Sequence, residues 1–376
     1  MMKERKGLLI FVLIILMFTA GVLLLPDKEF SKAEKRNLTT KSSFDSVSLM
    51  DGSLQETSKD YVADQFPMRD KFVKLYGNFQ RLIGNKKIED VYFGDDYLFE
   101  EYQPAKPEKI KSMAKAINEF AIKYPHIETD VLIAPTQVGV LEDNLPGFAP
   151  KGEQVKDIEM LYDRLASNIS KIDVIDKFKK DNRAEKNNYY YHSDHHWTSH
   201  GAKAAFDVYR KKNKLEIGQN KYEQLVISND FYGTLAAKTG IYAYPDQITV
   251  YVNKNKKDVV KVKYSDLDKA EYTLLAPKML ESDSGYNVFM KGNHPLVKIQ
   301  TGSESGKNLM VIKDSYANSF IPFLTPYYSN VIVVDPRYYF ESLKELIDNE
   351  YITDVLFLYN GTTFFQDGSL KDALES

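Results

Sequence analysis

The stretch that decides the fold lies near the C-terminus and reads Leu309-Met310-Val311-Ile312-Lys313-Asp314-Ser315. Its first four residues form an apolar run that is typical of a buried strand. Two further apolar runs follow at residues 331–334 and 354–359, and a helical pattern over residues 340–349 separates them. Apolar strands that alternate with helices are typical of a mostly parallel sheet with helices on both faces. The sequence therefore predicts an α/β fold.

The same alternation continues upstream. Helical patterns and short apolar runs predict a helix at 107–124, a strand at 130–134, a helix at 154–169 and a strand at 172–175. Residues 91–99 predict a strand, a turn and a second strand. The pattern changes between about residues 220 and 300, where runs such as 248–252 and 259–264 are rich in β-branched and aromatic residues. We expect a β-rich insertion there.

The N-terminus carries a candidate membrane anchor. An uncharged stretch covers residues 7–25 and is followed by Pro26. It is preceded by three cationic residues, Lys3, Arg5 and Lys6. A helix of this length spans roughly 28 Å, close to the thickness of the hydrocarbon core. A cleaved signal peptide has a shorter apolar core and a small-residue cleavage site. We therefore expect an uncleaved anchor with the cationic N-terminus inside and the rest of the chain outside the cell membrane.

These patterns divide the chain into three parts. Residues 1–26 form the cytoplasmic tip and the anchor, and residues 27–85 form a stalk with a helical segment from about Ser58 to Ile83. We expect residues 86–376 to form the α/β domain, which contains the candidate catalytic residues, with the insertion at about 220–300. The chain has 376 residues, a net charge of -3 and no cysteine. This composition excludes disulfides and a cysteine nucleophile, and gives no sign of a nucleic-acid partner.

The segment Tyr189–Ala202 contains four of the six histidines and the only tryptophan. Within it, Asp194 precedes His196 by two residues. A carboxylate so placed can orient an imidazole and stabilise its charged form, as in a Ser-His-Asp triad. Thr198 or Ser199 can then cap a helix that extends to about Lys212.

A nucleophile is expected where the strands of an open α/β sheet end, because ligands bind at that edge. Ser315 follows the strand at 309–312 after Lys313 and Asp314, and it precedes a predicted helix. The first N–H groups of that helix would be placed to stabilise an oxyanion. Serine is common in turns, so this pattern gains meaning only together with Asp194 and His196.

The chain resembles the DHHW family of bacterial proteins, relatives of the alginate O-acetyltransferases with an SGNH-hydrolase-like domain. The matching motifs are Asp194-His195-His196-Trp197-Thr198, Phe66-Pro67-Met68-Arg69-Asp70, residues 91–99 and Lys313-Asp314-Ser315-Tyr316-Ala317-Asn318. The resemblance runs from about residue 30 to the end. It implies an SGNH-hydrolase-like sheet flanked by helices. One departure stands out, because relatives often have Gly-Thr before the serine and this chain has Lys313-Asp314.

The resemblance also implies a mechanism. Ser315 would be the nucleophile, His196 the general base and then acid, and Asp194 the group that orients His196. The reaction would be O-acetyl transfer to a cell-surface or secreted polysaccharide through an acyl-enzyme, without a cofactor. A membrane-bound O-acyltransferase would supply the acyl group from across the membrane.

Several neighbours are candidates for binding substrate or the oxyanion: Gln137, Tyr316, Asn318, Asn360 and Trp197. Gln137 and Asn360 follow predicted strands, so their amides are expected at the same edge of the sheet. A second interpretation of the histidine cluster is a metal site in which His192 and His200 join Asp194 and His196. The motif lacks a clear distant ligand, so we predict no metal.

Two other functions fit the same residues. A carbohydrate esterase would use the same triad with water as the acceptor. A non-catalytic polysaccharide-binding or scaffold subunit of an export machine would keep the fold without the chemistry.

Overall fold

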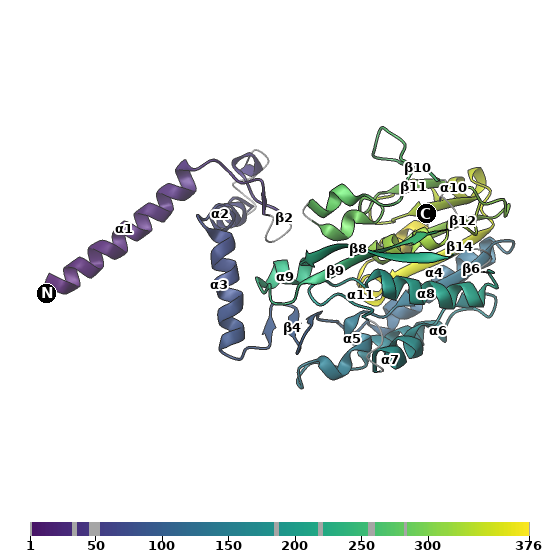
Figure 1. Ribbon diagram of the computed structural model, residues 1–376, viewed down its shortest axis with the longest axis horizontal. Helices are drawn as coiled ribbons and strands as arrows, with labels where there is room; N and C mark the ends of the chain where they lie inside the picture. The colour runs from purple at the N-terminus through teal and green to yellow at the C-terminus, as the bar shows by residue number, and fades with distance from the viewer. Residues whose placement is uncertain are drawn as a thin grey trace. The chain divides into compact units, whose positions relative to one another are not determined.

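The computed structural model describes residues 2–31, 36–44, 53–183, 188–216, 221–254, 260–281 and 284–375. They form two compact units (Figure 1). The smaller unit comprises Met1–Glu89 and Ala236–Ala243, and the larger comprises Asp90–Leu235 and Tyr244–Ser376.

The larger unit is built on a seven-stranded sheet with the strand order β10-β11-β13-β12-β14-β6-β7. In chain order the strands are β6 (Glu128–Ala134), β7 (Ser170–Lys171), β10 (Lys261–Tyr264), β11 (Leu296–Gln300), β12 (Asn308–Lys313), β13 (Asn330–Val334) and β14 (Asp354–Asn360). The five strands from β13 to β7 are parallel, and β11 is antiparallel to both of its neighbours. The predicted mostly parallel α/β fold is confirmed.

The central strands are buried along almost their whole length. Every residue of β14 is buried, as are the last five residues of β12. This continuous burial explains why their sequences are unbroken apolar runs, because both faces of a parallel sheet are covered. Phe120 of α4 (Pro107–Lys123) packs edge-on against Phe357 of β14, with 5.5 Å between ring centroids.

The other helices of this unit are α5 (Gln137–Val140), α6 (Glu153–Tyr162), α7 (Ile175–Arg183), α8 (Ser199–Lys212), α9 (Thr234–Thr239), α10 (Leu343–Asn349), α11 (Gly361–Gln366) and α12 (Ser369–Glu375), of which α9 continues into the smaller unit. The expected helix at 154–169 ends earlier, at Tyr162. The strand expected at 172–175 lies earlier, at Ser170–Lys171 (β7), where it pairs with β6. Residues 91–99 form the predicted hairpin, with β4 (Val91–Phe93) antiparallel to β5 (Leu98–Glu100).

The region expected as a β-rich insertion is divided between two sheets. Strands β8 (Tyr222–Phe231) and β9 (Asp246–Asn253) form a separate antiparallel pair. Strands β10 and β11 instead extend the main sheet, because β11 pairs with β13 from Leu296↔Val334 to Gln300↔Asn330. The first residue of the run predicted at 259–264 lies outside the described residues.

The smaller unit contains α1 (Met2–Leu24), α2 (Ser53–Asp64) and α3 (Arg69–Leu82). The segment expected to be helical from about Ser58 to Ile83 forms parts of two helices, because the helix is interrupted between Asp64 and Arg69. Pro67 disfavours a helical conformation at the residue before it, and Met68 has a positive φ of 61°. In the stalk, β1 (Phe30–Ser31) pairs with β2 (Arg36–Asn37), and the short helix η1 (Lys41–Phe44) follows.

Among the described residues, one helix is long and apolar enough to cross a membrane. It covers Lys6–Leu24 of α1, with a mean hydropathy of 2.9 and almost no burial within the protein. This is the stretch that the sequence predicts as the anchor.

The stability of the larger unit should depend on the buried centre of its sheet. Ile312 in β12 is fully buried, so Ile312→Ala is expected to lower the free energy of unfolding by about 2–5 kcal/mol. Ile122 on α4 is 72% exposed, and Ile122→Ala should change it by less than about 0.5 kcal/mol. Urea unfolding followed by the fluorescence of Trp197 measures both. Equal effects of the two substitutions would contradict this assignment of the core.

Candidate active site

The histidine-rich segment forms a loop whose two ends are joined. Tyr190 and Trp197 form an antiparallel bridge, and the N–H of Thr198 donates to the carbonyl of Tyr189 at 2.9 Å. The Thr198 side chain then accepts the N–H of Gly201 and caps α8, as predicted. The loop therefore presents Asp194, His195 and His196 from a closed and anchored turn.

The loop meets Ser315 across a gap of 119 residues in the sequence. Nδ1 of His196 lies 2.5 Å from Oδ1 of Asp194, and Nε2 of His196 lies 2.8 Å from Oγ of Ser315. The carboxylate also accepts the main-chain N–H of His196 at 3.0 Å. Asp194, His196 and Ser315 thus form a continuous hydrogen-bonded chain with the geometry of a Ser-His-Asp triad.

Ser315 lies at the carboxyl end of β12, where the sequence places it. It begins the short helix η5 (Ser315–Ser319), which Asp314 caps by accepting the N–H of Tyr316 at 2.9 Å. The other carboxylate oxygen of Asp314 accepts the N–H and the side-chain amide of Asn360 at 2.9 and 2.6 Å. The turn that carries Ser315 is therefore fixed to the end of β14.

A second segment holds the carboxylate of Asp194. Its Oδ2 accepts the N–H of Thr234 at 2.7 Å and the hydroxyl of Thr234 at 3.2 Å. Gly233 lies directly against Asp194, and a Cβ on Gly233 would lie 2.1 Å from the Cβ of Asp194. Only glycine permits this close approach.

The buried carboxylate of Asp246 also holds the histidine loop in place. Asp246, at the start of β9, accepts the N–H groups of His192 and Ser193 at 2.7 and 2.9 Å and the hydroxyl of Ser193 at 2.6 Å. Gln137 supports the loop from α5, because its amide nitrogen donates to the carbonyls of Tyr191 and Asp194 at 2.7 and 2.8 Å. Both amide hydrogens of Gln137 are used in this way, so the expectation that it binds the oxyanion is not supported by its geometry.

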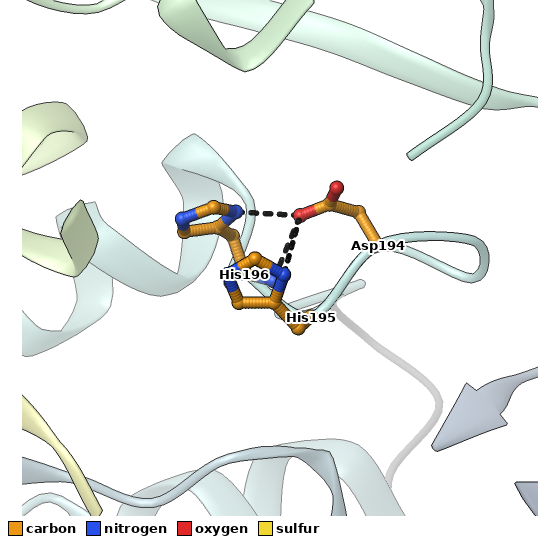
Figure 2. A group of neighbouring side chains, drawn as sticks. All are labelled: Asp194, His195 and His196. Carbon is orange, nitrogen blue, oxygen red and sulfur yellow. Dashed lines mark hydrogen bonds and ion pairs between the residues drawn. The ribbon is translucent and has the colours of Figure 1, made fainter. Parts of the chain in front are cut away.

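Two rings enclose the imidazole of His196. Tyr286 stacks on it with 3.8 Å between centroids and an interplanar angle of 12°. His195 lies on it at 3.9 Å and is held by Oγ1 of Thr234 at 2.7 Å from its Nδ1. Figure 2 shows the rings of His195 and His196 both turned toward the same oxygen of Asp194.

Burial and charge set the protonation of this group. Burial by itself raises the pKa of Asp194, but the imidazoles of His196 and His195 and the bond from Thr234 hold it well below its ordinary value. Burial also lowers the pKa of His196, and the nearby His195 acts in the same direction. At neutral pH this combination gives an ionised Asp194 and a neutral His196, which is the state that accepts a proton from a serine.

The remaining candidates are buried in supporting positions. The indole N–H of Trp197, which is fully buried, donates to the carbonyl of Tyr316 and to Ser319. The hydroxyl of Tyr316 donates to the carbonyl of His195 at 2.5 Å. The Asn318 amide donates to the carbonyl of Gly292, and that of Asn360 to Asp314. These contacts bind the polar groups of all four residues to other parts of the protein, and their role toward a substrate stays a prediction.

The second interpretation of the histidine cluster, a metal site formed by His192, His200, Asp194 and His196, does not agree with the contacts of His192 and His200. His192 contacts Asp246 at 3.0 Å, and His200 contacts the hydroxyl of Tyr251 at 2.6 Å. A different group, Asp194 with His195 and His196, has its donor atoms within 4.8 Å of one another. In that group, however, the short bond between Asp194 and His196 already occupies Nδ1 of His196, and its Nε2 faces Ser315.

The unusual Lys313 is part of a buried ionic group. Its ammonium lies 3.3 Å from Asp335 and donates to Oδ1 of Asn293 at 2.8 Å. Arg337 binds the same carboxylate through two nitrogens at 2.8 and 2.6 Å. Burial lowers the pKa of Lys313, whereas Asp335 acts to raise it. The side chains of Lys313 and Arg337 thus both bind the carboxylate of Asp335, next to the turn that carries Ser315.

Sequence reasoning missed Thr234, Gly233, Asp246 and Tyr286. All four lie between residues 220 and 300, in the region expected as an insertion, where no motif points to chemistry. The available signal was the pair Gly233-Thr234, which lies two residues after the end of β8. Glycine permits a close approach of the backbone to another segment, and threonine is typical of the start of a helix.

The fold and this arrangement define an α/β protein with a Ser-His-Asp chain at the carboxyl edge of its sheet. The chain belongs to the DHHW family, since residues 90–334 match the family model described as "DHHW protein". Among curated protein sequences none matches.

Three solved structures are similar to the chain. A DHHW family protein from Eubacterium siraeum has 22% sequence identity and a TM-score of 0.62, and the match covers 76% of this chain and 94% of that one. Bacillus cereus PatB1 with a sulfonyl adduct has 20% identity and a TM-score of 0.65, over 74% and 96% of the two chains. The O-acetyltransferase domain of Pseudomonas putida AlgJ has 13% identity and a TM-score of 0.46, over 76% and 98%. The first two likenesses show a shared fold.

The protonation of His196 is directly measurable. We expect its imidazole to titrate below the ordinary value of 6.5, because burial disfavours the charged ring. The ring should therefore be neutral above this lowered pKa and become charged only as the pH falls through it. A histidine-selective NMR titration measures the shift, with His196→Gln identifying the signal. Titration at or above 6.5 would contradict the expected direction.

The close approach of Gly233 provides a test of the geometry. The added methyl of Gly233→Ala would displace Asp194 and with it His196, and a displacement of about 1 Å costs about 100-fold in reactivity. We expect sulfonylation of Ser315 by a sulfonyl fluoride, followed by intact mass, to slow by this factor.

The matched control is Gly147→Ala, where no atom lies within 4 Å of the added Cβ. It should react at the unchanged rate. Equal rates for the two variants would show that Gly233 does not position Asp194.

Proposed function

We propose that this protein is an extracytoplasmic O-acyltransferase that moves an acyl group, most simply acetyl, onto a hydroxyl of a cell-surface or secreted polysaccharide. The observation that carries the proposal is the unbroken hydrogen-bonded chain from Asp194 through His196 to Ser315. The resemblance of the Asp-His-His-Trp motif to that of the alginate O-acetyltransferases, with a serine near the C-terminus, supports acyl transfer as the chemistry and a polysaccharide as the acceptor.

The first half-reaction forms an acyl-enzyme. Nε2 of His196 takes the hydroxyl proton of Ser315 as Oγ attacks the acyl carbonyl carbon, and Asp194 stabilises the resulting imidazolium. The tetrahedral intermediate then collapses, and His196 gives its proton to the leaving group. The N–H of Ser315 has no acceptor among the described residues, so in this scheme it is available to donate to the oxyanion.

The second half-reaction transfers the acyl group. A sugar hydroxyl takes the place of the leaving group and gives its proton to His196 while its oxygen attacks the ester carbonyl. Collapse releases the acetylated sugar, and the proton returns from His196 to Oγ of Ser315. The scheme uses no cofactor.

The N-terminal helix supports the location. We propose that α1 spans the cell membrane, with Lys3, Arg5 and Lys6 inside, that residues 27–85 lie next to the membrane and that residues 86–376 act outside. Acetyl-CoA is a cytoplasmic donor, so an outside enzyme needs a membrane-bound O-acyltransferase to deliver its acyl groups.

A direct assay tests the proposal. The detergent-solubilised full chain is incubated with a chromogenic acetyl ester, with and without an oligosaccharide acceptor. We expect acetylated sugar, and Ser315→Ala should lower its rate of formation by about 10⁴-fold, because the nucleophile is lost. Ser305→Ala, at an exposed serine outside the site, should leave the rate unchanged.

Each other outcome points to a different function. Ser315-dependent release of acetate with no acetylated sugar would overturn transfer and support the esterase. Turnover that is absent, or equal in Ser315→Ala, would overturn both enzymes and support a non-catalytic polysaccharide-binding or scaffold subunit of an export machine.

A further inference from the structure

Helix α3 of the smaller unit presents an exposed apolar face. Its large apolar side chains recur at spacings of three and four residues, which places them along one stripe of a helix. These exposed side chains are Phe72 (43% exposed), Leu75 (65%), Tyr76 (52%), Phe79 (54%), Leu82 (84%) and, at the helix end, Ile83 (59%). An apolar surface of this extent marks an interaction site.

The unit does not need this face for its own packing. A different side of α3 contacts residues 236–243, where a Cβ on Gly77 would lie 2.3 Å from the carbonyl oxygen of Thr239. Val73 lies against Gly240, and the ammonium of Lys74 lies 4.4 Å from the ring centroid of Tyr242. The exposed side chains of the stripe from Leu75 to Ile83 therefore remain uncovered after the unit has folded.

The first residue of the stripe is joined to the candidate anchor. Phe18 of α1 stacks on Phe66 with 4.7 Å between ring centroids, and Phe72 packs edge-on against both, at 6.2 and 5.8 Å. An apolar groove of about 400 Å³ continues along α1 beside these rings, lined by Ile14, Ile15, Phe18, Thr19, Val22, Leu23, Val62 and Phe66. The apolar surface of α3 is thus continuous with that of α1.

The contact with Phe18 determines how deeply Phe66 and Phe72 lie in a membrane that α1 spans. The apolar span Lys6–Leu24 matches the hydrocarbon thickness, so Leu24 lies near the outer boundary. Phe18 precedes Leu24 by six residues and hence lies about 9 Å inside that boundary. Phe66 and Phe72, which contact Phe18, must then lie in the outer leaflet as well.

The charges of α3 have the arrangement of a helix at a membrane surface. Lys74 and Arg81 lie off the apolar stripe, Lys71 lies at its edge, and Lys86 and Lys87 follow the helix. Aromatic and leucine side chains on one face with cationic residues on the other are typical of helices that lie in the interface of a bilayer. The cations also favour anionic lipid headgroups.

We propose that the apolar face of α3 is immersed in the outer leaflet of the bilayer that α1 spans. The lipid surface thereby covers Phe72, Leu75, Phe79 and Leu82 and holds the smaller unit at the membrane by two elements instead of one. This inference rests on the anchor stated under the proposed function, so its test must separate the two.

The absence of cysteine in the natural sequence allows a clean test. Single substitutions Phe79→Cys on the stripe, Arg81→Cys off it and Leu16→Cys on α1 are each labelled with an environment-sensitive fluorophore. The full chain is then reconstituted into vesicles of phosphatidylcholine and phosphatidylglycerol. Lipids that carry a spin label in the upper acyl chain quench a fluorophore in the outer leaflet, and iodide quenches one in water.

We expect the lipid quencher to reduce the signals at Leu16 and Phe79 by at least about twofold and to leave that at Arg81 nearly unchanged. Iodide should give the reverse order. Native-like thermal unfolding of each labelled variant confirms that the label has not disrupted the unit.

Three results would overturn the inference. If Leu16 is quenched by lipid while Phe79 is quenched by iodide, the anchor stands and the face of α3 is open to solvent, and so to a protein partner. If Phe79 is protected from both quenchers, a second copy of the chain covers the face. If Leu16 itself is not quenched by lipid, the anchor fails, and the inference fails with it.

Discussion

The site depends on one buried carboxylate and the bonds that make its charge tolerable. An ionised aspartate away from water is costly unless its oxygens are satisfied by donors. Asp194 has such donors on both oxygens, from His196 on one and from Thr234 on the other. The bonds come from two segments of the chain, so the charge of Asp194 draws the histidine loop and the start of α9 together and fixes the orientation of the imidazole.

Much of the fold was predictable because its signals are local. The buried strands β6, β12, β13 and β14 are apolar runs of the right length, and Ser315 follows one of them, so its place at the edge of the sheet was predictable too. The cap at Thr198 was likewise visible as a residue type in front of a helical pattern. The break at Pro67 was missed although proline is a strong local signal, because the apolar spacing on either side continues across it.

The rest was not predictable because it depends on distant contacts. The assignment of β10 and β11 to the main sheet is decided by pairing with β13, and nothing within the two strands themselves specifies that partner. For the same reason the sequence predicts the edge of the sheet at which Gln137 and Asn360 lie but not the groups to which they bind. Their positions follow from the strands that precede them, but their bonds follow from the loop and the turn that they meet in three dimensions.

The attachment of Asp314 to β14 has a consequence for how the protein is made. The turn that carries Ser315 is held by the N–H of Asp314 bonded to the carbonyl of Leu358, and by Asn360 at the end of the same strand. Leu358 and Asn360 follow Ser315 in the sequence by more than 40 residues, so they are synthesised after it. A chain that has left the ribosome only as far as Ser315 has its histidine loop and its serine but lacks the strand that fixes the turn. The turn around Ser315 can therefore take its final form only after β14 has been made.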